Sequence, residues 1–246
     1  MHRFFIKKQD IFENRIIVSG EDVKHISKVL RLKPGDRIVL CDGEGTDYLA
    51  AVESMNKDSI GTIILGKEAS KGEPDINVVL YQGIPKAAKM DIIIQKCTEM
   101  GIKRIVPTFT VRTVVRFESE KDERKKVERW TKIAEEAAKQ SGRGIIPVID
   151  MPVTLPQAIM DAAGLDLVII PYELETGLPV KEVLRKAKAR SIGFFIGPEG
   201  GFEPSEVERA KDIGAVPVSL GRRILRTETA GIAVLTSIMY EYDQMR

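Results

Sequence analysis

The sequence predicts a two-domain α/β protein in which a small β-barrel precedes a domain built on a mostly parallel sheet. With 246 residues, the chain is long for one ordinary domain. Short β-type runs dominate up to about residue 65, whereas strands and amphipathic helices alternate after about residue 75. The polar stretch 67–74 separates the two patterns and predicts a linker. We therefore expect domains at 1–70 and 75–246.

The N-terminal domain is predicted from short β-type runs that are separated by turn residues. The turns are Lys33–Asp36 and Asp42–Gly45, both rich in glycine, proline or aspartate. One helix is expected from about Gly20 to Leu30, where apolar residues recur at helical spacing. The predicted strands are 15–18, 37–41, 48–52 and 59–65.

The C-terminal domain is predicted from alternating apolar strands and amphipathic helices, which imply a mostly parallel sheet covered on both faces. Ligands of such sheets bind beyond the carboxyl ends of the strands. The predicted strands are about 77–81, 104–107, 145–150, 166–170, 191–196 and 215–220, and a β-type run is also expected at 111–116. The predicted helices are about 86–100, 122–139, 155–163, 179–189, 204–213 and 227–240.

The composition excludes several classes of protein. Hydrophobic residues make up 43% and charged residues 30%, and no stretch approaches the roughly 20 apolar residues of a membrane helix. The only cysteines, Cys41 and Cys97, are far apart in sequence and predict a reducing compartment, so we expect a cytoplasmic protein. With His2 and His25 as the only histidines, neither a metal site nor a Ser-His-Asp hydrolase is expected.

Net charge alone gives a weak indication of nucleic-acid binding. The chain carries a net charge of +2, and its positive charge is concentrated in residues 71–150, with 16 basic and 12 acidic side chains. Because this excess is modest, RNA binding must be argued from local clusters.

Three predicted loops follow strands at the same edge of the sheet, at 171–175, 197–202 and 220–231. The loop 197–202 holds three glycines and a proline, which let a ligand approach the main chain closely, although such a loop can also be a simple tight turn. The loop 220–231 holds Arg222, Arg223 and Arg226 before a helix for which Thr227 is the expected N-cap. Cations there are unfavourable unless an anion or an electron-rich group binds, so this loop indicates a functional site.

The usual nucleotide-binding signatures are missing from the sequence. No G-x-G-x-x-G segment links a strand to a helix, and no phosphate-binding G-x-x-x-x-G-K-[ST] loop is present. Hydride transfer and nucleotide hydrolysis therefore lose support.

The segments 196–202 and 220–230 together resemble the paired cofactor motifs of the RsmE family. These are SPOUT-superfamily methyltransferases that act on N3 of a uridine in small-subunit (16S) ribosomal RNA. The resemblance covers the whole chain and includes Arg3–Phe5, His25–Arg31, Lys89–Gly101 and Gln140–Arg143. It implies a PUA-like RNA-binding barrel, a SPOUT-type α/β domain with a trefoil knot, and a homodimer.

The resemblance also implies the functional residues. S-adenosylmethionine is expected to contact Leu174, Glu175, Gly197, Pro198, Glu199, Gly200, Gly201, Leu220, Gly221, Ile224, Leu225, Thr227 and Ala230. Arg226 and Glu228 are expected to face the reacting groups. Glu228 or Glu199 could remove the N3 proton, and each could instead cap a helix or bind the donor. The expected RNA contacts are Arg3, His25, Arg31, Lys86, Lys89, Arg112, Gln140 and Arg143, whose side chains can pair with phosphates or bases.

Two other functions remain open from the residues alone. One is a ribosome-associated RNA-binding protein without catalytic activity, which would need neither the glycine loop nor the arginine loop. The other is a knotted methyltransferase that acts on a ribose 2′-hydroxyl or on another base.

Overall fold

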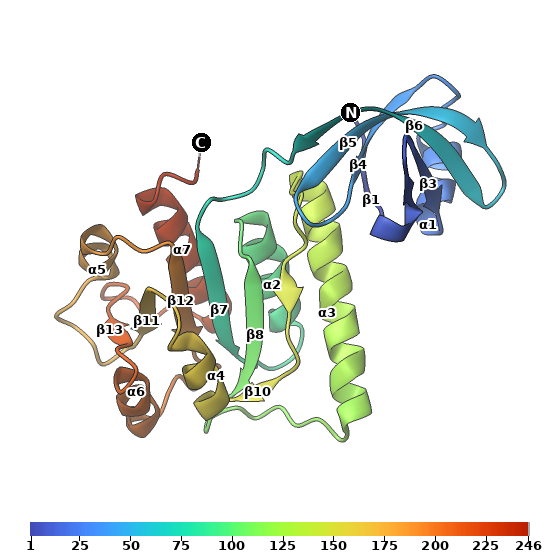
Figure 1. Ribbon diagram of the computed structural model, residues 1–246. Helices are drawn as coiled ribbons and strands as arrows, with labels where there is room; N and C mark the ends of the chain where they lie inside the picture. The colour runs from blue at the N-terminus through green and yellow to red at the C-terminus, as the bar shows by residue number, and fades with distance from the viewer. Residues whose placement is uncertain (246) are drawn as a thin grey trace. The chain divides into compact units, whose positions relative to one another are not determined.

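The computed structural model describes residues 1–245, which form two compact units (Figure 1). The first unit comprises Met1–Glu73 together with Ala138–Ile146. The second comprises Pro74–Ala137 and the chain from Pro147 onward. The segment Ala138–Ile146, which lies within the predicted C-terminal domain, thus packs with the N-terminal strands.

The first unit is a half-barrel built on a six-stranded mixed sheet with the order β1-β4-β5-β6-β3-β2. Strand β1 runs parallel to β4, and the other neighbours are antiparallel. The strands are β1 (Arg3–Phe5), β2 (Ile11–Phe12), β3 (Arg15–Ser19), β4 (Arg37–Cys41), β5 (Thr46–Met55) and β6 (Ser59–Ala69). Short helical segments are η1 (Lys8–Asp10), α1 (Glu21–Lys24) and the π-helical turn η2 (His25–Val29).

Period-two alternation of apolar residues places the core of this unit on one face of the sheet. In β3, Ile16 and Val18 are buried while their neighbours are exposed. The helix predicted from about Gly20 to Leu30 is present as α1 and η2, and its Val23 and Ile26 complete the core. The prediction of a linker at 67–74 was wrong at its start, because β6 pairs with β5 as far as Ala69. Backbone hydrogen bonds can extend an exposed strand without apolar side chains.

The second unit contains a seven-stranded sheet in which every neighbouring pair is parallel. The order is β10-β8-β7-β12-β11-β13, and β9 also pairs with β8. The strands are β7 (Asn77–Gly83), β8 (Arg104–Phe109), β9 (Val148–Ile149), β10 (Val153–Thr154), β11 (Leu167–Pro171), β12 (Ser191–Ile196) and β13 (Val216–Val218). The parallel sheet predicted from the alternating pattern is confirmed.

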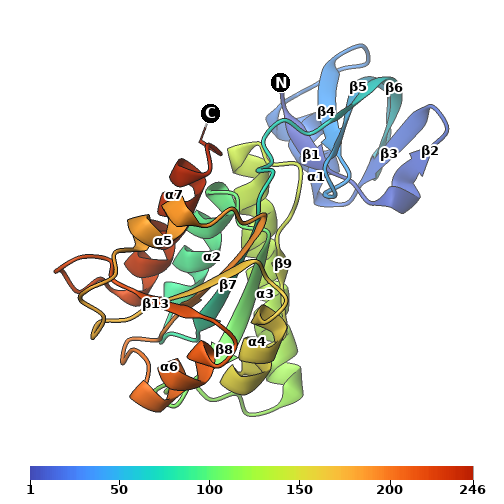
Figure 2. The ribbon, with the colours of Figure 1, turned by 60° about the vertical axis from the view of Figure 1, so that its left-hand side comes forward.

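Helices cover both faces of the parallel sheet (Figure 2). Helix α7 contacts β7, β12, α2 and α5 on one side, and α4 and α6 pack together on the other. Strand β7 is buried on both faces, so Val79 and Tyr81 face α4 and α6 while Leu80 approaches α7. The helices are α2 (Lys89–Glu99), α3 (Glu120–Ser141), α4 (Leu155–Ala162), α5 (Val180–Lys186), α6 (Pro204–Lys211) and α7 (Thr227–Glu241). The trefoil knot implied by the resemblance stays a prediction.

The β-type run expected at residues 111–116 is not a strand. Strand β8 ends at Phe109, and the chain then turns, with the Thr113 amide donating to the Thr110 carbonyl at 3.1 Å. The Thr113 hydroxyl also accepts from the Thr110 amide at 3.0 Å. These local hydrogen bonds outweigh the β propensity of the neighbouring valines.

Among residues 1–245, no helix combines the length and the apolar character needed to cross a bilayer.

Candidate functional site

A cleft of about 920 Å³ lies where β11, β12 and β13 end. These strands are parallel, so their carboxyl ends share one edge of the sheet. Small-molecule pockets typically measure about 300–1,000 Å³, so the cleft has room for a ligand the size of a nucleoside derivative. The cleft thus lies at the edge of the sheet that the sequence pattern indicated.

Most residues that the resemblance assigns to the methyl donor line this cleft. Leu174 is the exception, since its side chain is 68% exposed and does not contribute to the cleft wall. Arg226 also lines the cleft, whereas Glu228 does not. Ile196 and Phe202, which were not predicted as site residues, add apolar surface. Both are buried; Ile196 is the last residue of β12 and Phe202 lies in the loop after it.

The glycine loop 197–202 forms a tight turn that leaves no room for a side chain at position 197. The Gly201 amide donates to the Pro198 carbonyl at 3.0 Å, and Gly201 has a φ of +68°. A Cβ atom on Gly197 would lie only 2.9 Å from the carbonyl carbon of Gly201. Backbone therefore passes close to backbone here, and only glycine fits at position 197.

A relay of buried polar groups holds the start of this turn. The Thr227 hydroxyl donates to the Gly197 carbonyl at 2.6 Å, and Gln82 Nε2 donates to the same hydroxyl at 2.9 Å. The prediction that Thr227 is the N-cap of α7 was wrong. Arg226 occupies that position, and its side chain makes no capping hydrogen bond. Thr227 instead links α7 to the end of β12. Gln82 was not predicted as a site residue, although a glutamine in an otherwise apolar strand indicates a buried polar contact.

The loop after β11 is ordered by Glu175. Its Oε1 accepts hydrogen bonds from the Gly177 amide at 2.7 Å and the Leu178 amide at 3.0 Å. The Ser219 amide in turn donates to the Leu178 carbonyl at 2.8 Å, which ties this loop to the one after β13. Glu175 thus shapes the cleft wall through the backbone.

The loop after β13 presents unpaired cations beside the cleft. Arg222, Arg223 and Arg226 line the cleft and are exposed, and within residues 1–245 their side chains make no hydrogen bond or ion pair. Ile224 is 89% exposed among them. Because these cations add to the positive end of α7, they favour an anionic or electron-rich partner.

A second charge cluster lies in the loops that follow β7 and β12 and in the first turns of α2 and α7. Glu199 accepts hydrogen bonds from Lys89 Nζ at 2.8 Å and from the Lys86 amide at 3.1 Å. Lys89 Nζ also lies 3.9 Å from Glu228 Oε2, a buried oxygen that has no hydrogen bond within the described chain. Partial burial alone would raise the pKa of Glu199, but the bonds from Lys89 and from backbone amides outweigh it and lower the pKa. Glu199 is consequently a weaker base than an ordinary glutamate.

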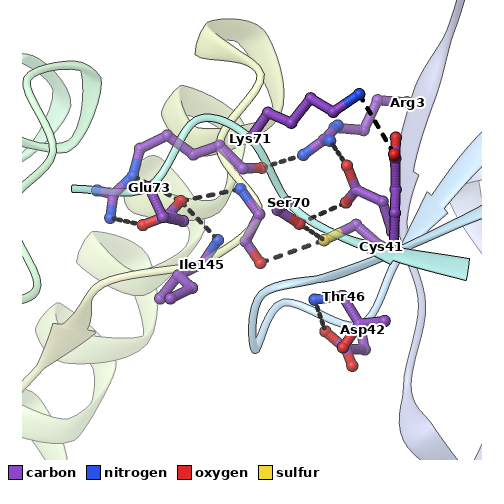
Figure 3. A network of polar contacts seen from close by, with 12 residues as sticks. Arg3, Cys41, Asp42, Thr46, Ser70, Lys71, Glu73 and Ile145 are labelled. Atoms are coloured by element: carbon purple, nitrogen blue, oxygen red, sulfur yellow. Dashed lines mark hydrogen bonds and ion pairs between the residues drawn. The ribbon is translucent and has the colours of Figure 1, made fainter. Parts of the chain in front are cut away.

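Two of the expected RNA contacts are instead engaged inside the first unit (Figure 3). Arg143 is 2% exposed and pairs with Glu73, whose Oε1 also accepts the amides of Gly144 and Ile145. Arg3 donates to the Arg143 carbonyl at 2.7 Å and pairs with Asp47. These contacts attach the segment 138–146 to the half-barrel. A structural role thus accounts for both arginines.

The remaining expected RNA contacts are accessible to different degrees. His25, Arg31, Lys86 and Gln140 are exposed, and Lys89 is half-buried in its ion pairs. Arg112 is exposed but bound to the glycine loop, with Nη1 donating to the Gly200 carbonyl at 2.6 Å. Among residues 1–245, no group of three or more histidine, cysteine or acidic side chains could hold a metal ion.

Comparison with known proteins adds the family to this geometry. Residues 72–239 match the RNA methyltransferase domain family, and residues 18–65 match the RNA methyltransferase PUA domain. Ribosomal RNA small subunit methyltransferase E of Bacillus subtilis is 35% identical, with 100% of this chain and 99% of that protein covered. The Synechocystis protein of the same name is 31% identical, with 96% and 77% covered.

A solved structure agrees over nearly the whole fold. Ribosomal RNA small subunit methyltransferase E from Neisseria gonorrhoeae, crystallised with S-adenosylmethionine, has a TM-score of 0.84 and 28% identity. The match covers 98% of this chain and 97% of that one. The chain therefore belongs to the RNA methyltransferase family that includes the ribosomal RNA small subunit methyltransferases E.

Proposed function

We propose that the protein transfers a methyl group from S-adenosylmethionine to N3 of a uridine in small-subunit (16S) ribosomal RNA. The observation that carries the proposal is the cleft at the carboxyl edge of the sheet, which joins a turn with three glycines to a loop of unpaired arginines. The family and the relatives named above support the same activity. We also propose a cytoplasmic location, which an rRNA substrate of this kind supports.

The cleft has the features that a methyl donor requires. The glycine turn lets the main chain approach a ligand, and Ile196, Phe202 and Leu225 supply apolar surface for an adenine ring. S-adenosylmethionine supplies an activated methyl group on a positively charged sulfur. The protein then has to orient the donor and the uracil so that N3 lies in line with the methyl carbon.

Uridine N3 carries a proton that must leave before the nitrogen can attack, so a proton acceptor is needed. Glu199 is the poorer candidate because its pKa is lowered. We propose Glu228, which does not line the cleft itself but lies 3.9 Å from Lys89 Nζ in the cleft wall. Its buried Oε2 lacks a hydrogen bond within the described residues and so gains by accepting one. Arg226 is proposed to stabilise the negative charge that develops on the uracil.

RNA is proposed to reach the second unit along the arginine loop and the start of α2. Arg222, Arg223 and Lys86 are exposed and can pair with phosphates. In the first unit, His25 and Arg31 are exposed on or just after η2 and are proposed to contact RNA through the PUA-like half-barrel. Arg3 and Arg143 are not included, because their side chains hold the segment 138–146.

Donor binding is the direct test of the proposed function. Calorimetry with S-adenosylhomocysteine should give one site per chain, and saturating ligand should raise the melting temperature, since a ligand that binds only the folded state stabilises it. A ribosome-associated protein without catalytic activity would show neither effect. Mass mapping of the modified nucleoside, in rRNA from cells lacking and then regaining the gene, should then find methylation at uridine N3 and not at a ribose 2′-hydroxyl.

A homodimer is also proposed. The proposal rests on the resemblance and not on spare apolar surface of α7, because Val234, Leu235, Ile238 and Met239 of that helix are buried within the chain itself. Tyr240 remains 75% exposed at the end of the helix. One chain has a mass of 27.4 kDa, and we expect light scattering at micromolar concentration to give twice that mass. A single-chain mass would contradict the dimer.

A further inference from the structure

Arg112 bridges two parts of the loop that follows β12. Its Nη1 donates to the Gly200 carbonyl at 2.6 Å, and its Nε donates to Glu203 Oε1 at 2.8 Å. Gly200 lies in the glycine turn, and Glu203 is the N-cap of α6. One guanidinium group therefore holds the turn against the helix that follows it.

The backbone around Arg112 is itself anchored to the same helix. The Val111 amide donates to Glu206 Oε1 at 2.8 Å, and the other carboxylate oxygen of Glu206 accepts the Glu203 amide at 2.9 Å. Glu206 is buried. The backbone beside Arg112 and the two acceptors of its side chain are thus held by the same helix. The guanidinium group therefore loses little conformational entropy when it forms its two hydrogen bonds.

The aliphatic part of Arg112 also covers Gly200. A Cβ atom at Gly200 would lie 3.1 Å from Arg112 Cβ and 3.2 Å from Cδ. The open side of Gly200 therefore faces the arginine. Together with Thr227, which binds the Gly197 carbonyl, Arg112 holds the glycine turn at both of its ends.

We propose that Arg112 is a positioning residue that pre-organises the glycine turn for the methyl donor, and that its contacts are not with RNA. The inference rests on the proposed function, because it concerns the same cleft. When the turn is already held in its binding conformation, less conformational entropy is lost on binding, and the affinity for the donor is higher.

The test separates positioning from phosphate binding by comparing Arg112→Lys with Arg112→Met. Lysine keeps the charge that a phosphate needs but cannot donate to both acceptors in the geometry of a guanidinium. We expect both variants to bind S-adenosylhomocysteine roughly tenfold more weakly, the scale of losing a charge-assisted hydrogen bond. Binding of an rRNA fragment, measured by filter retention, should match the wild type in both variants. Weaker RNA binding by Arg112→Met alone would show that Arg112 contacts a phosphate and would contradict the inference. Arg116→Lys, in the same exposed loop, is the matched control and should keep wild-type donor affinity.

A double-mutant cycle with Gly200→Ala tests the contact itself. The added methyl group would lie 3.1 Å from Arg112 Cβ, 3.2 Å from Cδ and 3.6 Å from Cγ. Arg112→Ala removes Cγ and Cδ and keeps Cβ, so part of the effect of Gly200→Ala on donor affinity should disappear in the Arg112→Ala background. Additive effects would contradict the contact. Wild-type donor affinity in both Arg112→Lys and Arg112→Met, or full donor affinity in Arg112→Lys alone, would overturn the inference and leave the proposed function standing. Failure of the wild-type protein to bind S-adenosylhomocysteine would overturn both.

Discussion

Gly197→Ala should weaken the binding of S-adenosylhomocysteine by roughly a hundredfold while the rest of the fold remains intact. The added Cβ would lie 2.9 Å from Gly201 C and 3.0 Å from Gly201 Cα. These are backbone atoms of a turn closed by the Gly201 amide on the Pro198 carbonyl, so they cannot move without opening the turn. Overpacking of this kind forces the backbone to shift. Calorimetry of the purified variant measures the loss.

The matched control is Gly164→Ala in the same unit. A Cβ at Gly164 meets nothing within 4 Å, so this variant should bind the ligand as the wild type does. Circular dichroism and thermal unfolding establish that both variants are folded. Wild-type affinity in folded Gly197→Ala would exclude the glycine turn from the donor site.

The parallel sheet could be predicted because its strands are short apolar runs that alternate with amphipathic helices. In β7 and β12 nearly every residue is buried, and this pattern is typical of strands covered on both faces. Irregular loops were harder. Residues 111–116 have strand-like composition, but the fold of this loop depends on two hydrogen bonds donated by its own backbone amides. The Thr113 hydroxyl accepts one and Glu206 Oε1, far along the sequence, accepts the other.

The candidate site was predictable where chain geometry alone creates it. Glycines and arginines directly after strands indicated the edge of the sheet at which the cleft lies, because parallel strands end together. The partners of individual side chains were not predictable. Arg143 resembles an RNA contact in sequence, yet it is buried against Glu73, 70 residues away. Arg112 resembles one too, but it binds the Gly200 carbonyl across a separation of 88 residues.

Arg226→Ala should lower the single-turnover rate of methyl transfer to small-subunit rRNA particles by roughly a hundredfold, the scale of losing one positioned donor. Arg226 is the N-cap of α7 and lines the cleft, and its side chain is exposed without a capping hydrogen bond. Its charge adds to the positive end of the helix dipole, which is unfavourable in the protein alone. An RNA phosphate, or the negative charge on a deprotonated uracil, makes the electrostatic free energy of the Arg226 charge favourable. The same charge that destabilises the free protein therefore stabilises the transition state.

Donor binding separates this role from a structural one. Because Arg226 is exposed and binds no other side chain of the described residues, Arg226→Ala should fold normally and keep its affinity for S-adenosylhomocysteine. Arg209→Ala is the control: Arg209 is exposed on α6 of the same unit, outside the cleft, and its loss should leave the rate unchanged. Equal single-turnover rates for Arg226→Ala and the wild type would exclude Arg226 from the reaction. Loss of folding would show that α7 needs this N-cap after all, and the developing charge on uracil would then have to be stabilised by Arg222 or Arg223, the other exposed cations of the same loop.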